Sequence, residues 1–327
     1  MVTKLSLSRL SETLKYPIDL FICCSSYESR SLAVAQNLDL AKVKSAFVVM
    51  NSNLLEHVRA SAEALSALLP NPSIVETSTV DPIITADAFG RMLTSRQVQW
   101  EATCERHVVV DMTTFTHEGL LILLQVLLRH FAENVHIDLV YTGATYSPET
   151  DPCSGWLSRG VRQVRSVLGY PGKMMPTNKT HLIVLVGYED DRAMSLIQAY
   201  EPEVLSLGYG TPGTHTSSGD GETTNRRFHE LVKQAYATHP DVREFAFSCC
   251  DPVDARDAIM LQVRQTPKHN HAIAPMNTKM STLGSALVNL ADESVQLCYA
   301  QAWLYNYAEY SQPGTNAYLL DLRSLFA

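Results

Sequence analysis

Two polar turns, each between an apolar run and a helical pattern, carry the residues best suited to binding an anion. The apolar runs are Leu20–Cys24 in the first half of the chain and His181–Val186 in the second. An arginine can grip a phosphate through two N–H bonds, and a turn before a helix exposes backbone N–H groups. The residues predicted to bind a ligand there are Ser25, Ser26, Tyr27, Arg30, Tyr188, Glu189 and Arg192. The alternative is that the glutamate and arginine only pair with each other on the first helical turn.

A second polar turn follows a later apolar run in each half. The residues predicted to bind a ligand there are Thr113, Thr114, Asn277, Thr278 and Lys279. A lysine beside the free N–H groups of a helix start makes a phosphate site. The first copy has Phe115 at the position of Lys279. We therefore expect the second copy to bind if only one does, although hydroxyls at a helix start also cap the helix.

Acid–base catalysis has fewer candidates than ligand binding. They are Glu28, Asp111 and His117, which are the residue types that transfer protons in enzymes. Asp81 and Asp251 each precede a proline and a helical pattern, which favours a capping role over a catalytic one. The motifs G-x-S-x-G, Walker A and H-E-x-x-H are absent from the sequence. The sequence therefore does not decide whether the protein is an enzyme.

Aromatic residues gather after the last apolar run of each copy. They are Tyr141, Tyr146 and Trp156 in the first copy, and Tyr299, Trp303, Tyr305, Tyr307 and Tyr310 in the second. Such rings suit a stacked base, and they equally suit an interface.

The elements that position these turns are repeated along the chain. Ser78–Ala88 matches Ser248–Ala258 without a gap, and the polar turns occur in the same order in both halves. Apolar runs such as Ala46–Met50 alternate with helical patterns such as Leu54–Leu69, which is typical of a parallel sheet covered on both faces. The sequence predicts the α/β class, with two tandem Rossmann-like three-layer units made by internal duplication, each with a mostly parallel sheet. The expected domains are residues 1–172 and 173–327.

Composition and charge exclude several classes of function. The 327 residues are 46% hydrophobic and 18% charged, as in ordinary globular proteins. The net charge of −8, from 26 basic and 34 acidic residues, disfavours broad nucleic-acid binding. The longest apolar run, Gly119–Leu128, is short of the roughly 20 residues that cross a bilayer, so we expect no membrane association and a cytoplasmic protein. Seven irregularly spaced cysteines without a C-x-x-C pair predict neither disulfides nor a metal site, and we expect no cofactor.

The turn after the first apolar run and the segment Asn277-Thr-Lys-Met-Ser281 resemble those of CARF and SAVED domains. These are Rossmann-like sensors of cyclic oligonucleotides in CRISPR and related anti-phage systems, and tandem pairing of units is SAVED-like. The glycine pair often found in the family's second turn is missing here, and no effector domain is attached. The resemblance implies a sensor that acts alone or on a separate effector.

The sequence thus predicts that the protein binds or senses a nucleotide, such as a cyclic oligonucleotide, or another phosphorylated small molecule in prokaryotic defence or signalling. Two alternatives stay open at this point. One is a Rossmann-like enzyme that cleaves or transfers a nucleotide, and the other is a pseudo-symmetric structural subunit of a complex. Self-association as a homo-oligomer is compatible with all three.

Overall fold

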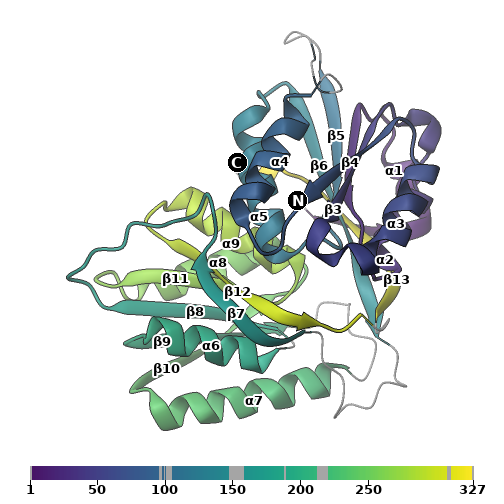
Figure 1. Cartoon of the computed structure of the whole chain (residues 1–327). Helices are drawn as coiled ribbons and strands as arrows, with labels where there is room; N and C mark the ends of the chain where they lie inside the picture. Colours follow the sequence, from purple (N-terminus) through teal and green to yellow (C-terminus); the bar gives the residue numbers. More distant parts are fainter. Residues whose placement is uncertain are drawn as a thin grey trace. The chain divides into compact units, whose positions relative to one another are not determined.

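A computed structural model describes residues 2–95, 98, 100, 105–146, 158–187, 189–211, 220–307 and 311–325. The chain forms two compact units (Figure 1). The first contains Met1–Ser147 and Tyr307–Ala327, and the second contains Pro148–Asn306. The expected division lay between residues 172 and 173. Here Ser158–Ser166 belongs to the second unit, because it pairs with a strand of that unit, and the end of the chain belongs to the first.

The first unit is built on a seven-stranded sheet of described residues, in the order β1-β13-β6-β5-β2-β3-β4. The strands from β6 to β4 are parallel to their neighbours, whereas β13 and β1 are antiparallel additions at one edge. Counted along the chain, the parallel strands have the Rossmann order 3-2-1-4-5. The strands are β1 (Thr3–Ser6), β2 (Leu20–Cys24), β3 (Ala46–Asn51), β4 (Pro72–Thr77), β5 (Arg106–Asp111), β6 (Val135–Tyr146) and β13 (Ser311–Asp321).

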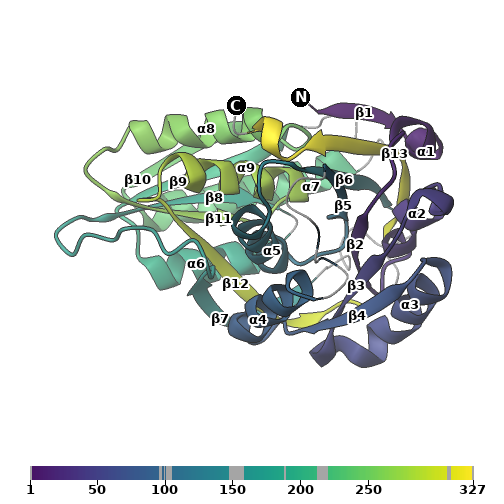
Figure 2. The same cartoon turned by 90° about the horizontal axis from the view of Figure 1, so that it is seen from above.

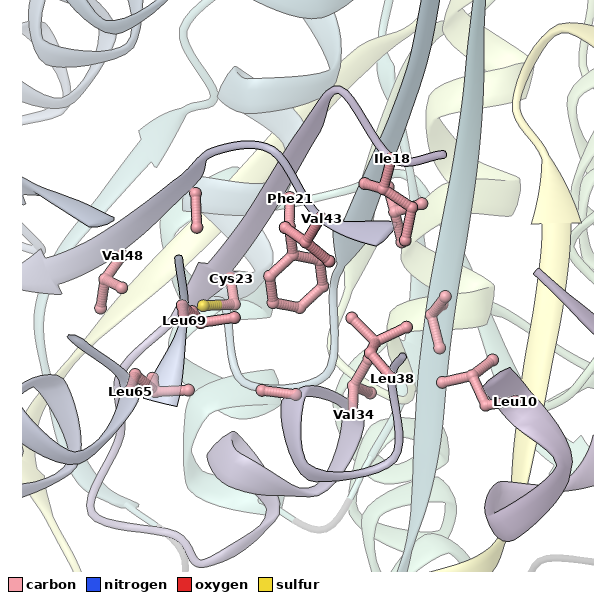
Figure 3. Close-up of a cluster of buried hydrophobic side chains, with 14 of the residues drawn as sticks. Leu10, Ile18, Phe21, Cys23, Val34, Leu38, Val43, Val48, Leu65 and Leu69 are labelled. Carbon is pink, nitrogen blue, oxygen red and sulfur yellow. The ribbon is translucent and has the colours of Figure 1, made fainter. Parts of the chain in front are cut away.

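Helices cover both faces of this sheet (Figure 2). The helices α2 (Arg30–Gln36) and α3 (Leu55–Leu68) lie on one face, together with the short α1 (Leu10–Thr13), and α4 (Pro82–Leu93) and α5 (His117–His130) lie on the other. Phe21, Cys23 and Val48 of the sheet pack with Val34 and Leu65 of the helices in the core drawn in Figure 3. Because both faces are covered, β2 is buried along its whole length, which explains its unbroken apolar sequence.

The second unit repeats this plan. The order of its sheet is β10-β9-β8-β11-β12-β7, in which only β7 is antiparallel to its neighbour. The strands are β7 (Ser158–Ser166), β8 (Thr180–Val186), β9 (Val204–Thr211), β10 (Asp241–Ser248), β11 (Asn270–Pro275) and β12 (Gln296–Tyr305). The helices are α6 (Asp190–Tyr200), α7 (Asp220–Thr238), α8 (Pro252–Arg264) and α9 (Lys279–Ala291), with α6 and α7 on one face and α8 and α9 on the other (Figure 1). Among the described residues, no helix combines the length and apolar character needed to cross a bilayer.

The predicted fold class, with two Rossmann-like units, is confirmed. The caps are repeated as well: Asp81 accepts hydrogen bonds from the N–H groups of Ile83 and Ile84 in α4, and Asp251 does the same for the first turn of α8. The antiparallel strands β13 and β7 were not predicted. Each of these two crossing strands belongs to one unit but follows the fifth parallel strand of the other, since β13 follows β12 and pairs with β6, while β7 follows β6 and pairs with β12.

Candidate functional site

Both predicted pairs of turns lie at the point where Rossmann-like sheets bind ligands. In the first unit, β2 and β5 are neighbours, and the chain leaves them toward opposite faces, into α2 and α5. In the second unit, β8 and β11 are neighbours, and they lead into α6 and α9. A parallel sheet opens a crevice at this switch point, beyond the carboxyl ends of its strands. The fold therefore brings the two predicted turns of each unit together at one edge of its sheet.

In the second unit the two turns are in direct contact. The side-chain amide of Asn277 donates to the carbonyl of Val186, the last residue of β8, at 2.7 Å. A methyl group added at Gly187 would overlap the carbonyl oxygen of Met276, so this approach of the backbones requires glycine. Tyr188, the next predicted residue, lies outside the described residues.

The turn before α9 presents a helix N-terminus and a cation. Thr278 caps the helix by accepting from the N–H of Ser281 at 3.2 Å, and its own hydroxyl donates to the carbonyl of Cys249 at 2.9 Å. Lys279 follows as the first helical residue and is partly exposed. Burial raises the pKa of Cys249 to about 12, so this neighbouring thiol stays protonated and is a poor nucleophile. The turn is therefore suited to binding an anion.

The corresponding turn of the first unit has a different composition. Thr116 is the cap of α5 and accepts from the N–H of Gly119 at 3.0 Å. Thr114 donates to the carbonyl of Cys24, the last residue of β2, at 2.7 Å, as Asn277 does to the end of β8 in the second unit. Thr113 is buried, and its hydroxyl accepts from the N–H of Thr142. The sequence match had placed Phe115 opposite Lys279, and the phenylalanine is buried in the core.

A pocket opens at this edge of the first unit. Its wall consists of strand ends, α4, and α5 with the turn before it, and it includes hydroxyl and amide side chains. The lining residues are Cys24, Val49, Asn51, Thr77, Ser78, Thr85, Phe89, Phe115, Thr116, Glu118, Gly119 and Ile122. Glu118 is 3% exposed and is the one charged residue among them. The spacing of polar residues around Thr116 indicated this turn, but not the contribution of the β3 and β4 ends.

The two predicted arginines are buried and paired with glutamates. Arg30 donates to Glu28 at 2.7 Å and to the carbonyl of Thr142 in β6 at 3.3 Å. Arg192 likewise pairs with Glu189, and its Nη2 donates to the carbonyl of Ala300 in β12 at 2.6 Å. Their exposed fractions are 8% and 7%. Burial disfavours the charge of Arg192, but Glu189, Tyr299 and Tyr305 together outweigh this effect and hold the pKa of Arg192 above its usual value.

Each glutamate also accepts a hydrogen bond from the crossing strand of its unit, β13 in the first unit and β7 in the second. Ser311, the first residue of β13, donates its hydroxyl to Glu28, and Ser158, the first residue of β7, donates to Glu189. The serine, glutamate and arginine thus form the same buried triad in both units. This geometry favours a pairing of the glutamate with the arginine over ligand binding by these two residues. The sequence did not predict that either serine completes the pair.

Three other residues of the first unit that were predicted to bind a ligand directly precede Glu28 in the chain. Ser25 is fixed to β3, because its hydroxyl donates to the carbonyl of Val49 at 3.1 Å. Ser26 accepts from the N–H of Glu28 at 3.2 Å, which shapes the turn. Tyr27 packs edge-on against Tyr307, with ring centroids 5.4 Å apart.

A stack of two aromatic rings in the first unit was also not predicted from the sequence. The ring of Tyr307 stacks on His57 of α3 with a centroid distance of 3.4 Å and an interplanar angle of 5°. The contact places one residue of the predicted aromatic segment beside the turn that holds Tyr27. Tyr146, Trp156 and Tyr310 lie outside the residues whose side chains are described.

The three catalytic candidates differ in their access to solvent. Glu28 is held in its triad, whereas His117 is the partly exposed first residue of α5. Asp111 is 1% exposed at the end of β5 and accepts from the N–H of Thr113 at 3.0 Å. Burial raises the pKa of Asp111 to about 7, although the hydrogen bonds from Thr113 and the charge of Arg30 act in the opposite direction. A carboxyl group so enclosed is better placed to affect stability than to exchange protons with a substrate.

Comparison with known proteins gives only distant similarities. No protein-family model and no curated protein matches the sequence. Among solved structures, the chain is similar to a type III CRISPR defence DNA nuclease activated by cyclic oligoadenylate, with a TM-score of 0.47 and 9% identity over 81% of this chain and 63% of that chain. It is also similar to an S-adenosylmethionine-dependent methyltransferase from Clostridium acetobutylicum, with a TM-score of 0.24 and 8% identity over 44% of this chain and 57% of that chain. The chain therefore spans less than two thirds of either protein, and its ligand has to be inferred from the chemistry of its own turns.

Proposed function

We propose that the protein binds a nucleotide or another phosphorylated small molecule at the carboxyl edge of its second unit, as the sensing component of a defence or signalling system. The observation that carries this proposal is the turn Asn277–Lys279, held against Gly187 at the switch point of the sheet. The cyclic oligonucleotides implied by the resemblance to CARF and SAVED domains are the first ligands to test.

The turn before α9 attracts an anion for two physical reasons. The helix has 13 residues, and its dipole places a partial positive charge at Lys279. The ammonium group of Lys279 adds a full charge on the same side. Together these groups make the kind of site that binds phosphate at a strand-to-helix turn. Because Arg30 and Arg192 are buried in their triads, we assign the phosphate contact to Lys279 and not to the arginines.

The carboxyl edge of the first unit does not suit a phosphate. The charge of Glu118 in the pocket opposes a phosphate, whereas hydroxyl and amide groups such as Asn51 and Thr77 can bind donors and acceptors. These groups suit a small uncharged polar group, because the space between them holds little more than a water molecule. The two copies are thus proposed to have diverged, with the anion bound by the second.

A thermal-unfolding screen tests the proposal. The panel contains ATP, a cyclic dinucleotide, a cyclic oligoadenylate and, as a control without phosphate, adenosine. A ligand at 100 times its dissociation constant contributes about 2.7 kcal/mol, which raises the unfolding temperature of a protein of this size by several degrees. We expect a rise with at least one phosphorylated compound and none with adenosine. An unchanged unfolding temperature across the panel would oppose the proposal and favour a protein partner.

A further inference from the structure

A cluster of metal-binding side chains lies at the opposite, amino-terminal edge of the first sheet. His107 of β5 donates or accepts through Nε2 at 2.8 Å from Asp138 of β6, and His136 is 3.1 Å from the other oxygen of the same carboxylate. The ligand atoms of these three residues all lie within 4.8 Å of one another. Asp321 of β13 is 3.9 Å from His136 Nδ1.

The register of the strands holds these residues on one face of the sheet. His107 lies directly opposite His136, and Asp138 lies directly opposite Asp321. His136 and Asp138 are two residues apart in one strand, so their side chains point to the same face. Four potential ligands are therefore carried by three neighbouring strands, and none depends on a loop for its position.

Their distances and burial fit a bound metal ion. In tetrahedral zinc sites with bonds of about 2.1 Å, neighbouring ligand atoms are about 3.4 Å apart, so the two histidine–aspartate contacts need to open by only a few tenths of an ångström. His107 and Asp138 are buried, whereas the side chain of His136 is 49% exposed and leaves a path for the ion.

The internal duplication argues against a merely structural cluster. Structural devices recur in both units, as the aspartate caps and the buried triads do. His271 of β11 takes the place of His107 in the second unit, but the register puts Val295 and Leu297 at the positions of His136 and Asp138. The histidine–aspartate set is thus an addition to the shared fold. The sequence did not predict this cluster, because its members come together only through the register of β5, β6 and β13.

We propose that His107, His136 and Asp138, assisted by Asp321, form a binding site for a divalent transition metal, for which Zn²⁺ is the natural probe. Imidazole nitrogen and carboxylate oxygen are both zinc ligands, and imidazole does not suit Mg²⁺ or Ca²⁺. The ion would link β5 and β6 to β13, the strand that returns to this unit after the chain has formed the second one. The site is independent of the proposed nucleotide function.

The test is calorimetric titration of Zn²⁺ into the metal-free, full-length protein. We expect one ion to bind per chain and the unfolding temperature to rise, with EDTA reversing the change. His136→Gln is expected to weaken binding at least tenfold. The matched control is His269→Gln, because His269 also pairs with a carboxylate, that of Glu203 at 2.9 Å, but belongs to no such cluster within the described part of the chain. The control should bind Zn²⁺ as the wild type does.

Absence of binding, or equal affinity in the wild type and His136→Gln, would overturn the proposal. If His136→Gln does not fold, the absorption spectrum of the wild type with Co²⁺ replaces it as the test. Tetrahedral nitrogen and oxygen ligands give Co²⁺ an intense visible band, whereas the weak band of the hydrated ion would contradict the site.

Discussion

Replacement of Asp111 by asparagine is expected to stabilise the protein at neutral and alkaline pH. The Asp111 carboxyl group is 1% exposed at the end of β5, where it accepts a hydrogen bond from the N–H of Thr113. Burial penalises its ionised form and raises its pKa from 3.8 to about 7. Asparagine keeps an oxygen that can accept from Thr113 but is neutral at every pH, so the variant avoids this penalty.

The size and sign of the effect follow from the difference between the two pKa values. Between about pH 4 and pH 7 the folded state keeps the proton on Asp111 while the unfolded state loses it. Stability contributed by the neutral group is therefore fully present below pH 4 and is lost as the pH rises through 7. A difference of about three units at roughly 1.4 kcal/mol per unit gives a penalty of about 4 kcal/mol above pH 7.

Urea unfolding of the wild type and Asp111→Asn at several values from pH 4 to pH 8 measures this penalty. The difference in unfolding free energy should grow in favour of the variant by a few kcal/mol across that range, because all other titrating groups are common to both proteins. Asp257→Asn serves as the control for the loss of one negative charge, since its side chain is 64% exposed. A difference between Asp111→Asn and the wild type that stays constant with pH would refute the reasoning.

Four further substitutions test the packing described above by the same unfolding measurement. Gly187→Ala should destabilise the second unit by about 1–3 kcal/mol because the added methyl overlaps the carbonyl of Met276. Gly90→Ala, in the interior of α4 with open space around it, should instead stabilise by about 0.5–1 kcal/mol, and equal effects at both glycines would contradict the close approach at Gly187. Ser311→Ala removes a hydroxyl that donates to the largely buried Glu28 and should cost about 1.5–3 kcal/mol of stability. An unchanged stability would mean that the triad does not hold β13 in place. Asp251→Ala removes the cap of α8 and should cost about 0.5–2 kcal/mol, and no loss would contradict the capping role.

The parallel strands were predictable because burial on both faces leaves a local signature. Leu20–Cys24 is a continuous apolar run and became β2 with the same bounds. The crossing strands leave no such signature, since only Ser158 is buried in Ser158–Ser166, which also carries three arginines. Their pairing depends on contacts across the chain, which sequence periodicity does not encode.

The candidate site also has parts that the local sequence predicts and parts that it does not. Sequence spacing identified both turns, because polar residues between an apolar strand and a helix are a local feature. It did not reveal the use of Arg30, because the third member of its triad, Ser311, is 283 residues from Glu28. The histidine–aspartate cluster was missed for a related reason, since its members meet only through the register of neighbouring strands.

Calorimetric titration of the phosphorylated nucleotide selected by the screen tests the central claim most directly. Lys279→Ala removes the ammonium group at the start of α9, and the control Lys268→Ala removes an exposed lysine at the other edge of the same unit. A charge-assisted hydrogen bond contributes about 1.5–3 kcal/mol, so we expect Lys279→Ala to weaken binding by about tenfold or more and Lys268→Ala to leave it unchanged. Equal affinity of the wild type and Lys279→Ala would contradict the assignment of the phosphate site.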